Sequence, residues 1–245
     1  MKISHVKRIH MRMGLLEKDT FIVPKNKTGE TKTIVSPSGK YTLTIEQYTT
    51  LPGCWNFSRG IVKKESVILF DIKRNYGTFF YNFVIHSNGN EYLLCGEDYQ
   101  GYNILNLTDG TNLAYLRPEA RQGRGFCWID ANPSPDGTKI LIKGCYWACP
   151  EEIVIYDFSD PTTVPLREIK RDYLCDLWST NKIEWIDNNT IKISWINDIE
   201  EDETEDDIKS TTEMFNQQLE IVTKKEKGFV FTKISDSLAE IILKV

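Results

Sequence analysis

The sequence predicts an all-β fold in which a unit of four strands recurs along the chain. Three observations support this prediction. Short apolar stretches rich in β-branched and aromatic residues recur throughout, tight-turn sequences recur about 50 residues apart, and helical periodicity is restricted to a few short stretches. With 245 residues, of which 40% are apolar, the chain is long enough for one large all-β domain or two small domains.

Each repeat is marked by a strand-reversing turn. The four turn sequences are SPSG, HSNG, SPDG and IDNN, and they begin at Ser36, His86, Ser134 and Ile186. Proline presets φ in the first and third turns, where Gly39 and Gly137 accept a positive φ. Asn-Gly and Asn-Asn in the other two turns tolerate left-handed conformations. The chain is therefore predicted to reverse direction at these four positions.

Strand-like sequences flank the turns. The first strand of each repeat lies before the turn, in the sequences KTIV, YNFVIH, GFCWID and KIEWID. The second strand follows the turn directly. The third strand is predicted in SVILFDIKRN, YNILNLTDGT, EIVIYDFSDP and NQQLEIVTKK. A fourth strand is predicted in LAYL, VPLREI and FVFTKI. Near the end of the chain, Ser237 and Glu240 stand at capping-box spacing, but LAEIILKV is too short for a self-stable helix and fits a final strand equally well.

Four strands that recur every 40 to 50 residues, roughly, are the pattern of a propeller blade, which must stack on its neighbours to bury its faces. The predicted fold is therefore a small β-propeller-like domain of four to five four-stranded blades, with a twisted β-sandwich as the alternative. The repeats occupy residues 33–245, with an acidic mobile insertion at 198–207. Residues 1–32 form an N-terminal segment whose FIVP sequence is a candidate ring-closing strand.

The SPDG turn from Ser134 to Gly137, followed by IYDFSD, resembles WD-repeat and related β-propeller families. The resemblance extends roughly from Thr33 to Ile234, although the Gly-His and Trp-Asp dipeptides of typical WD repeats are missing. The strings GEDYQGY, GFCW, PSPDG and GCYWACPEE also resemble a set of uncharacterised bacterial and large-virus proteins. This second resemblance implies no catalytic residue.

The net charge of -5 comes from one segment. DIEEDETEDD, from Asp198 to Asp207, carries eight acidic residues and no basic ones, so the rest of the chain has a formal charge of +3. A nearly neutral body does not attract nucleic acid or anionic lipid over a broad surface, and neither is expected as a partner. Eight carboxylates in one short run repel one another, so this segment is predicted to be a solvated insertion.

Targeting features and cysteine content indicate an intracellular protein. The N-terminus has no apolar stretch of the secretory type, and the chain nowhere approaches the run of about 18 apolar residues that a membrane span needs. We therefore expect a soluble, cytoplasmic protein that does not contact membranes. Six cysteines are too sparse for a disulfide scaffold, so they are predicted to be free thiols.

The sequence GCYWACPEE places two cysteines close together. If the preceding strand continues to Cys149, then Cys145, Trp147 and Cys149 lie on one face, and a local disulfide is impossible at that separation. The favoured role of both thiols is apolar packing. Because Cys54 and Cys95 also precede or enter second-to-third-strand connections, a four-thiolate zinc site is the alternative. Its spacing lacks the usual two close pairs, so no metal or cofactor is predicted.

The connections between the second and third strands of each repeat are predicted to form a binding face. Aromatic residues with a few charges are typical of protein interfaces, and they also stack on sugar rings. The predicted partner is therefore a protein, with a glycan as the second class. The residues of this face are Tyr48, Trp55, Arg59, Glu97, Asp98, Tyr99, Tyr102, Tyr146, Trp147, Glu151 and Glu152.

A hydrolytic enzyme, such as a glycan-active one, is the competing hypothesis. Glu97, Asp98, Glu151 and Glu152 supply paired carboxylates, which a glycoside hydrolase needs across a cleft. Most Ser-His or Cys-His schemes would depend on His86, which sits in an ordinary turn sequence. Adjacent loop carboxylates are usually solvated, so no catalytic residue is assigned, and a non-catalytic interaction module is the favoured function.

Overall fold

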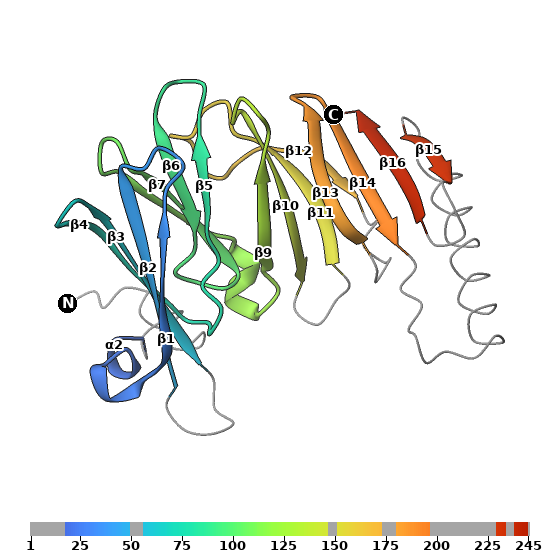
Figure 1. Ribbon diagram of the computed structural model, residues 1–245. Helices are drawn as coiled ribbons and strands as arrows, with labels where there is room; N and C mark the ends of the chain where they lie inside the picture. Colours follow the sequence, from blue (N-terminus) through green and yellow to red (C-terminus); the bar gives the residue numbers. More distant parts are fainter. Residues whose placement is uncertain are drawn as a thin grey trace.

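The computed structural model describes residues 18–49, 56–146, 151–172, 180–196, 229–233 and 238–244. Over these ranges the chain forms four antiparallel sheets of four strands each (Figure 1). The predicted all-β, propeller-like fold is confirmed, with one sheet for each repeat. The described helices are short, namely α2 (Lys18–Phe21), η1 (Pro24–Asn26) and η2 (Pro118–Gln122). Within these ranges no helix has the length and hydropathy needed to cross a membrane.

The first two sheets are simple meanders in which neighbours along the chain are neighbours in the sheet. The first sheet contains β1 (Lys27–Val35), β2 (Tyr41–Tyr48), β3 (Phe57–Lys64) and β4 (Val67–Arg74). The second sheet contains β5 (Asn82–Ile85), β6 (Glu91–Cys95), β7 (Gly101–Asn106) and β8 (Asn112–Leu116).

The third sheet is also a meander, whereas the fourth changes its strand order. The third sheet contains β9 (Phe126–Pro133), β10 (Lys139–Tyr146), β11 (Glu151–Asp157) and β12 (Glu168–Asp172). The fourth sheet contains β13 (Thr180–Asp187), β14 (Thr190–Ile196), β15 (Phe229–Lys233) and β16 (Leu238–Lys244), in the spatial order β13-β14-β16-β15.

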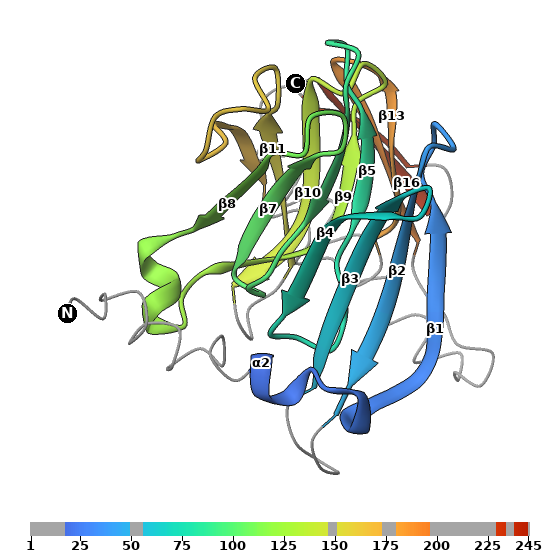
Figure 2. The ribbon, with the colours of Figure 1, turned by 90° about the vertical axis from the view of Figure 1, so that its left-hand side faces the viewer.

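The sheets stand side by side in chain order. The first sheet lies at one end of this row and the fourth at the other, as the two perpendicular views show (Figures 1 and 2). The second sheet is covered on both faces. In β6, Leu93 and Cys95 pack toward the first sheet, while Tyr92 and Leu94 pack toward the third. Because successive side chains point to opposite faces, a strand between two layers is apolar at every position.

The turns after the first strand of each sheet contact one another. Ser87 donates its N–H to the carbonyl oxygen of Asp136 at 2.9 Å, and Asp136 donates its N–H to Oδ1 of Asn188 at 3.0 Å. In the first sheet, Ser38 hydrogen-bonds to Glu91 of β6. The predicted turns are therefore present, and those of the first three sheets also join their sheet to the next one.

The strand assignment in the first sheet needs a correction. SVILFDIKRN corresponds to β4, the fourth strand, and the third strand is β3, which the sequence did not suggest. Glycine is unfavourable in a strand interior, and Gly60 lies in the middle of β3. The structure supplies the reason for this glycine: an added Cβ would lie 2.2 Å from Cζ of Phe79, whose ring packs directly on Gly60.

The expected strand order of the fourth sheet was also wrong. The strand beside β14 is β16, from the LAEIILKV sequence, and FVFTK forms the outer strand β15. Ile193 pairs with Ile241 in this ladder. Of the two alternatives left open for LAEIILKV, the strand is the one observed. NQQLEIV and the acidic insertion 198–207 lie outside the described residues.

The N-terminal FIVP sequence adds no strand to the sheets in the described part. Phe21 ends α2, and its ring stacks on Phe57 with centroids 5.3 Å apart. Ile22 is buried beside Tyr48 and Phe57. This segment therefore covers the first sheet where β2 ends and β3 begins. Strand β1 begins at Lys27, inside the predicted N-terminal segment 1–32.

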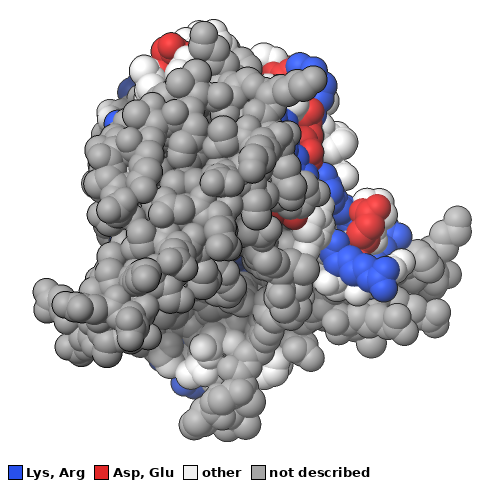
Figure 3. All heavy atoms as spheres, turned by 90° about the vertical axis from the view of Figure 1, so that its right-hand side faces the viewer, with Lys and Arg blue, Asp and Glu red and all other residues white. Residues whose placement is uncertain are grey.

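Acidic and basic side chains of the described residues lie next to one another. Figure 3 views the molecule from the side of the fourth sheet, where the visible Lys and Arg side chains alternate with Asp and Glu. Specific pairs occur in several sheets, such as Arg59 with Asp71 at 2.7 Å and Lys192 with Glu184 at 2.8 Å. Opposite charges thus neutralise one another locally.

The IYDFSD sequence ends in a turn organised by Asp157. Oδ1 of this residue accepts hydrogen bonds from Oγ and the backbone N–H of Ser159, at 2.6 and 3.0 Å. These bonds, with one from Arg167, lower the pKa of Asp157 to about 2. A lowered folded-state pKa means that the stabilisation is complete above the unfolded value of 3.8 and is lost as the pH falls from there through about 2.

Replacing Ser159 by alanine should therefore raise the pKa of Asp157 toward 3.8, because the Ser159 hydroxyl, the donor that lowers this pKa most, is removed. A carboxyl-carbon NMR titration measures this change directly. Thr162→Ala is the matched control, since Thr162 donates to Asp160 instead. An unchanged Asp157 titration in Ser159→Ala would show that the turn does not hold this carboxylate.

Candidate functional site

The described connections lie at two ends of the molecule. The β6–β7 connection (96–100) lies at one end, together with the links 75–81 and 117–125 that join successive sheets (Figure 1). The turns after the first strand of each sheet lie at the opposite end. We call the first of these the loop end.

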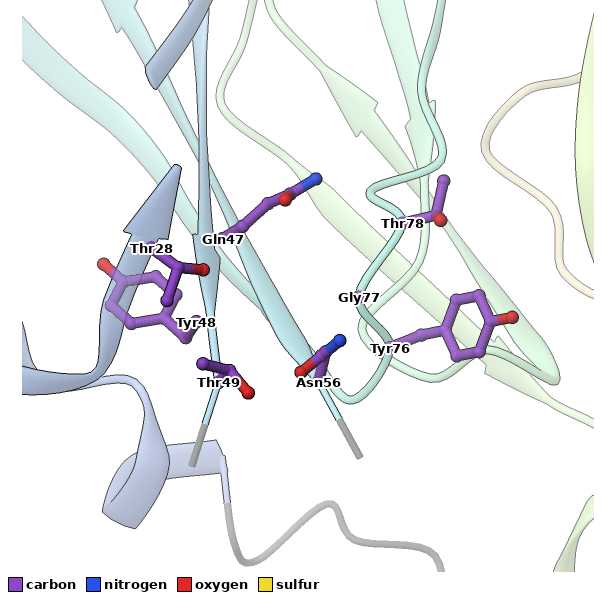
Figure 4. A pocket seen from close by; sticks show the side chains of 8 residues that line it. All are labelled: Thr28, Gln47, Tyr48, Thr49, Asn56, Tyr76, Gly77 and Thr78. Atoms are coloured by element: carbon purple, nitrogen blue, oxygen red, sulfur yellow. The ribbon is translucent and has the colours of Figure 1, made fainter. Parts of the chain in front are cut away.

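A polar pocket of about 620 Å³ opens at the loop end, between the first sheet and the link that follows it (Figure 4). Strands β1 and β2 form one wall, and the link after β4 forms the other. The lining residues are Thr28, Gln47, Tyr48, Thr49, Asn56, Tyr76, Gly77 and Thr78. Their side chains are hydroxyls, amides and phenols, so the pocket offers hydrogen bonds without a formal charge.

Two amide side chains in the polar pocket have no hydrogen-bond partner among the described residues. Gln47 and Asn56 are both exposed. In Figure 4 the Gln47 amide is directed toward the link, and Asn56 lies between Thr49 and Gly77. Each amide group can donate and accept at once, so both remain available to a ligand.

The link is held in place by local contacts. Oγ of Ser58 donates to the carbonyl oxygen of Tyr76 at 2.6 Å. Gly77 lies so close to Asn56 that an added Cβ would be 2.9 Å from the Asn56 Cβ. The link therefore packs closely against the start of β3.

In the first sheet, the predicted face residues serve the sheet itself. Tyr48 is buried, and its hydroxyl donates to Glu46 at 2.6 Å. Arg59 makes two 2.7 Å hydrogen bonds to Asp71, which hold the pKa of Arg59 above its usual value. Tyr48 also lines the polar pocket. Trp55 lies outside the described residues.

In the second sheet, the predicted residues have mixed surroundings. Glu97 forms an ion pair with Lys18 at 3.2 Å. Asp98 is buried, accepts hydrogen bonds from Asn75 Nδ2 at 3.0 Å and Gln100 N at 2.8 Å, and has its pKa raised by burial. Tyr99 is half-buried and contacts the ring of Tyr76, with centroids 5.9 Å apart.

Tyr102 belongs to the interior. Its ring stacks on Trp128 with centroids 4.4 Å apart, and its hydroxyl accepts a 2.7 Å hydrogen bond from the backbone N–H of Leu166. Burial raises the pKa of this phenol. Tyr102 therefore joins the second and third sheets, and only its edge reaches a surface groove beside Glu97 and Lys18.

In the third sheet, the predicted residues gather around Arg171. Its guanidinium binds Glu152, bonds to Glu168 at 2.8 Å, and lies 5.7 Å from the ring centroid of Tyr146. Burial lowers the pKa of Arg171, but these two carboxylates raise it more. Glu151 pairs with Cys145 in the β10–β11 ladder. Trp147 lies outside the described residues.

The cysteine segment differs from the expected extended strand. β10 ends at Tyr146, and Cys145 already pairs with Glu151, so the expectation of one strand continuing to Cys149 was wrong. Cys145 instead lies opposite Cys127 of β9, a neighbour that the sequence did not suggest. Burial, with a smaller effect of Cys145, raises the pKa of Cys127 to about 12.

Cys95 is the other described member of the predicted thiol set. Cys95 is fully buried in β6, and burial raises its pKa. Cys54 and Cys149 lie outside the described residues. Among those described, no group of three or more His, Cys, Asp or Glu side chains is arranged to hold a metal ion.

His86 organises its turn. Asn88 donates its N–H to Nδ1 at 3.0 Å, so the ring donates from Nε2 to the carbonyl oxygen of Phe158 at 2.9 Å. The imidazole is buried between Tyr92 and Phe158. Both ring nitrogens are thus occupied by backbone groups.

Apart from Tyr48, the residues of the polar pocket were not predicted from the sequence. Only the connections within each sheet were considered, whereas the link from Tyr76 to Thr78 joins two sheets and lies at the same end. The available signal was NYGT after β4, a turn-type sequence directly following a strand.

Comparison with known proteins gave one clear relative. The chain is 31% identical over 217 residues to the "Uncharacterized protein R762" of Acanthamoeba polyphaga mimivirus, a match that covers 86% of this chain and 82% of the relative. No protein-family model matches the chain. The predicted similarity to large-virus proteins is confirmed, and the relation to WD repeats stays a prediction.

Solved structures with some likeness include propeller-containing chains. The Myceliophteria thermophila Cps50 (Swd1) beta-propeller domain has a TM-score of 0.38 and 14% identity, over 75% of this chain and 51% of that one. Prolyl oligopeptidase B from Galerina marginata has a TM-score of 0.40 and 12% identity, over 69% of this chain and 22% of that one. The chain therefore spans about half of the first and about a fifth of the second.

Proposed function

The chain belongs to the family of the mimivirus protein R762, whose name states no activity, and from this premise and the geometry of the loop end we propose that it is a non-catalytic interaction module. The proposed partner is a protein, and the polar pocket receives an extended segment of its chain. The observation that carries the proposal is the pair of uncommitted amides, Gln47 and Asn56, in a pocket of about 620 Å³.

The chemistry of the polar pocket suits a peptide backbone. An extended peptide presents N–H donors and C=O acceptors in alternation, and each side-chain amide can satisfy one of both kinds. Thr28 and Thr78 add hydroxyls, and the exposed ring of Tyr76 adds apolar contact area. Aromatic residues of this kind contribute strongly to binding at protein interfaces.

The lining of the polar pocket offers no acid-base pair for catalysis. A hydrolase needs a nucleophile beside a base, or two carboxylates across a cleft. The eight lining residues include neither arrangement. The predicted carboxylates with described side chains are engaged elsewhere, since Glu97 pairs with Lys18, Asp98 with Asn75 and Glu152 with Arg171.

Peptide selection from a random display library tests this proposal. Peptides that bind the wild-type protein should lose at least about tenfold in affinity for Gln47→Ala/Asn56→Ala, since two hydrogen-bonding groups are removed. The melting temperature should stay nearly constant, because both side chains are exposed and uncommitted. Lys40→Ala, at the opposite end of the first sheet, is the matched control.

Three results would contradict the proposal. Selection of peptides that bind the double variant equally well would place binding elsewhere. Turnover of chromogenic glycosides or esters by the wild-type protein, lost in Glu97→Gln, would favour the hydrolase instead. Binding on a glycan array with no selected peptide would identify a glycan as the partner and overturn the peptide assignment.

A further inference from the structure

A second cavity lies on the other side of the link after β4. Its volume is about 280 Å³, near the lower end of the range for small-molecule sites. Tyr76 and Thr78 separate it from the polar pocket, since they line both. We call it the aromatic pocket, and its lining residues are Arg74, Tyr76, Thr78, Phe80, Tyr99, Cys127, Trp128, Ile129 and Cys145.

Among the described residues that line the aromatic pocket, only Arg74 is charged. It is 3% exposed. Nε donates to the carbonyl oxygen of Thr78 at 3.0 Å, and Nη1 donates to those of Gly96 and Asp98 at 2.7 and 3.1 Å. A guanidinium has five N–H groups, so these bonds use three of them. The two N–H groups of Nη2 have no hydrogen-bond partner among the described residues.

The buried guanidinium also has no carboxylate bound to it in the described part of the chain. Asp98 is the nearest candidate, but its carboxylate oxygens accept from Asn75 and Gln100. Carbonyl dipoles and the ring of Tyr76, whose centroid lies 6.0 Å from Cζ, therefore face the charge, with no carboxylate hydrogen-bonded to it among the described residues. Burial lowers the pKa of Arg74 to about 10, which agrees with incomplete compensation. A buried charge in this state favours an anion at its free N–H groups.

The remaining walls of the aromatic pocket are mostly rings. Tyr76 and Tyr99 are in contact on one side, with centroids 5.9 Å apart. Phe80 and Trp128 meet edge to face on another side, with centroids also 5.9 Å apart. Ring faces and edges at this spacing suit a planar aromatic group, which gains from offset and edge contacts.

From these features we infer that the aromatic pocket binds a small aromatic carboxylate. The carboxylate accepts the two N–H groups of Arg74 Nη2, and the ring lies against Tyr76, Tyr99 and Trp128. Such a group belongs either to a free metabolite or to the C-terminal residue of a peptide. This inference is independent of the proposed function, because Gln47 and Asn56 do not line the aromatic pocket.

Calorimetric titration of the wild-type protein with matched acid and amide ligands tests carboxylate recognition. Phenylacetate and indole-3-acetate are expected to bind at least about tenfold more tightly than phenylacetamide and indole-3-acetamide, because only the acids form charge-assisted hydrogen bonds. Peptides ending in phenylalanine, with free or amidated C-termini, distinguish the second source. Absence of binding by every acid, or equal binding of acids and amides, would overturn the inference.

Chemical labelling locates the bound ligand. Cys145 lines the aromatic pocket and is partly exposed, so iodoacetamide labelling mapped by mass spectrometry reports on access to this cavity. Indole-3-acetate should slow labelling of Cys145, whereas indole-3-acetamide at the same concentration should not. Equal labelling with and without bound acid would place the ligand elsewhere and overturn the assignment.

Two substitutions complete the test. Arg74→Lys should weaken binding of the acids at least about tenfold and leave binding of the amides unchanged, since the planar donor pair is lost. Tyr99→Ala should weaken both ligand types, while Tyr81→Ala, a partly buried tyrosine outside the pocket, should weaken neither. If Arg74→Lys does not fold, the Tyr99→Ala and Tyr81→Ala variants test the site. Equal affinity of these two variants for indole-3-acetate would overturn the inference.

Discussion

Gly137→Val is expected to lower the free energy of unfolding by at least about 3 kcal/mol. Two separate costs add at this position. The backbone φ of Gly137 is +70°, a conformation that a β-branched residue resists, and an added Cβ would lie 2.5 Å from the carbonyl oxygen of Ile85 in the neighbouring sheet. Urea-induced unfolding followed by circular dichroism measures the change.

Gly39→Val separates these two costs. Gly39 occupies the same place in the equivalent turn and has a φ of +74°, but an added Cβ would meet no atom within 4 Å. The Gly39 variant should therefore show only the backbone cost, about 1 to 3 kcal/mol. Equal effects of the two substitutions would mean that the third turn does not pack against the second sheet as described.

The second large effect is expected at Gly60. Gly60→Ala should destabilise the protein by about 1 to 3 kcal/mol, because the new methyl group would displace the buried Phe79 ring. Phe79→Ala alone should cost about 3 to 5 kcal/mol through the cavity it leaves. Combined, the two should cost clearly less than the sum of the single effects, since the methyl group then fills part of that cavity.

A double-mutant cycle with urea unfolding tests this coupling. Gly89→Ala is the comparison for a backbone cost without a steric clash, since Gly89 has a φ of +85° and an added Cβ there meets no atom within 4 Å. Strict additivity of Gly60→Ala and Phe79→Ala would contradict direct packing of the ring on β3. It would also remove the explanation for a glycine in the middle of that strand.

The second sheet was predictable because its signals are local. Its turn contains Asn88-Gly89, its strands are short apolar runs, and each pairs with the next one along the chain. The third strand of the first sheet was not predictable, because Gly60 reads as a poor strand residue until Phe79 is known to lie on it. That contact joins a strand of the first sheet to the link that follows the sheet, and no local pattern records it.

The site was predictable only in its general position. The predicted β6–β7 connection does lie at the loop end, and Tyr48 and Tyr99 line cavities there. Asp98 and Tyr102 were predicted in the same binding face as Tyr48 and Tyr99, yet both are buried and hold neighbouring segments together. Whether a loop residue points outward depends on its tertiary partners, such as Asn75 for Asp98 and Leu166 for Tyr102.

The strand order of the fourth sheet has a consequence for the order of events during synthesis. Each strand of the first three sheets pairs with the strand made just before it, so those sheets can form as the chain emerges. β14 must wait for β16, from Leu238, more than forty residues later in the chain, and β15 emerges before β16, the strand with which it pairs. Closing so long a loop is slow, so the nascent chain is expected to carry three finished sheets beside an exposed β13–β14 hairpin.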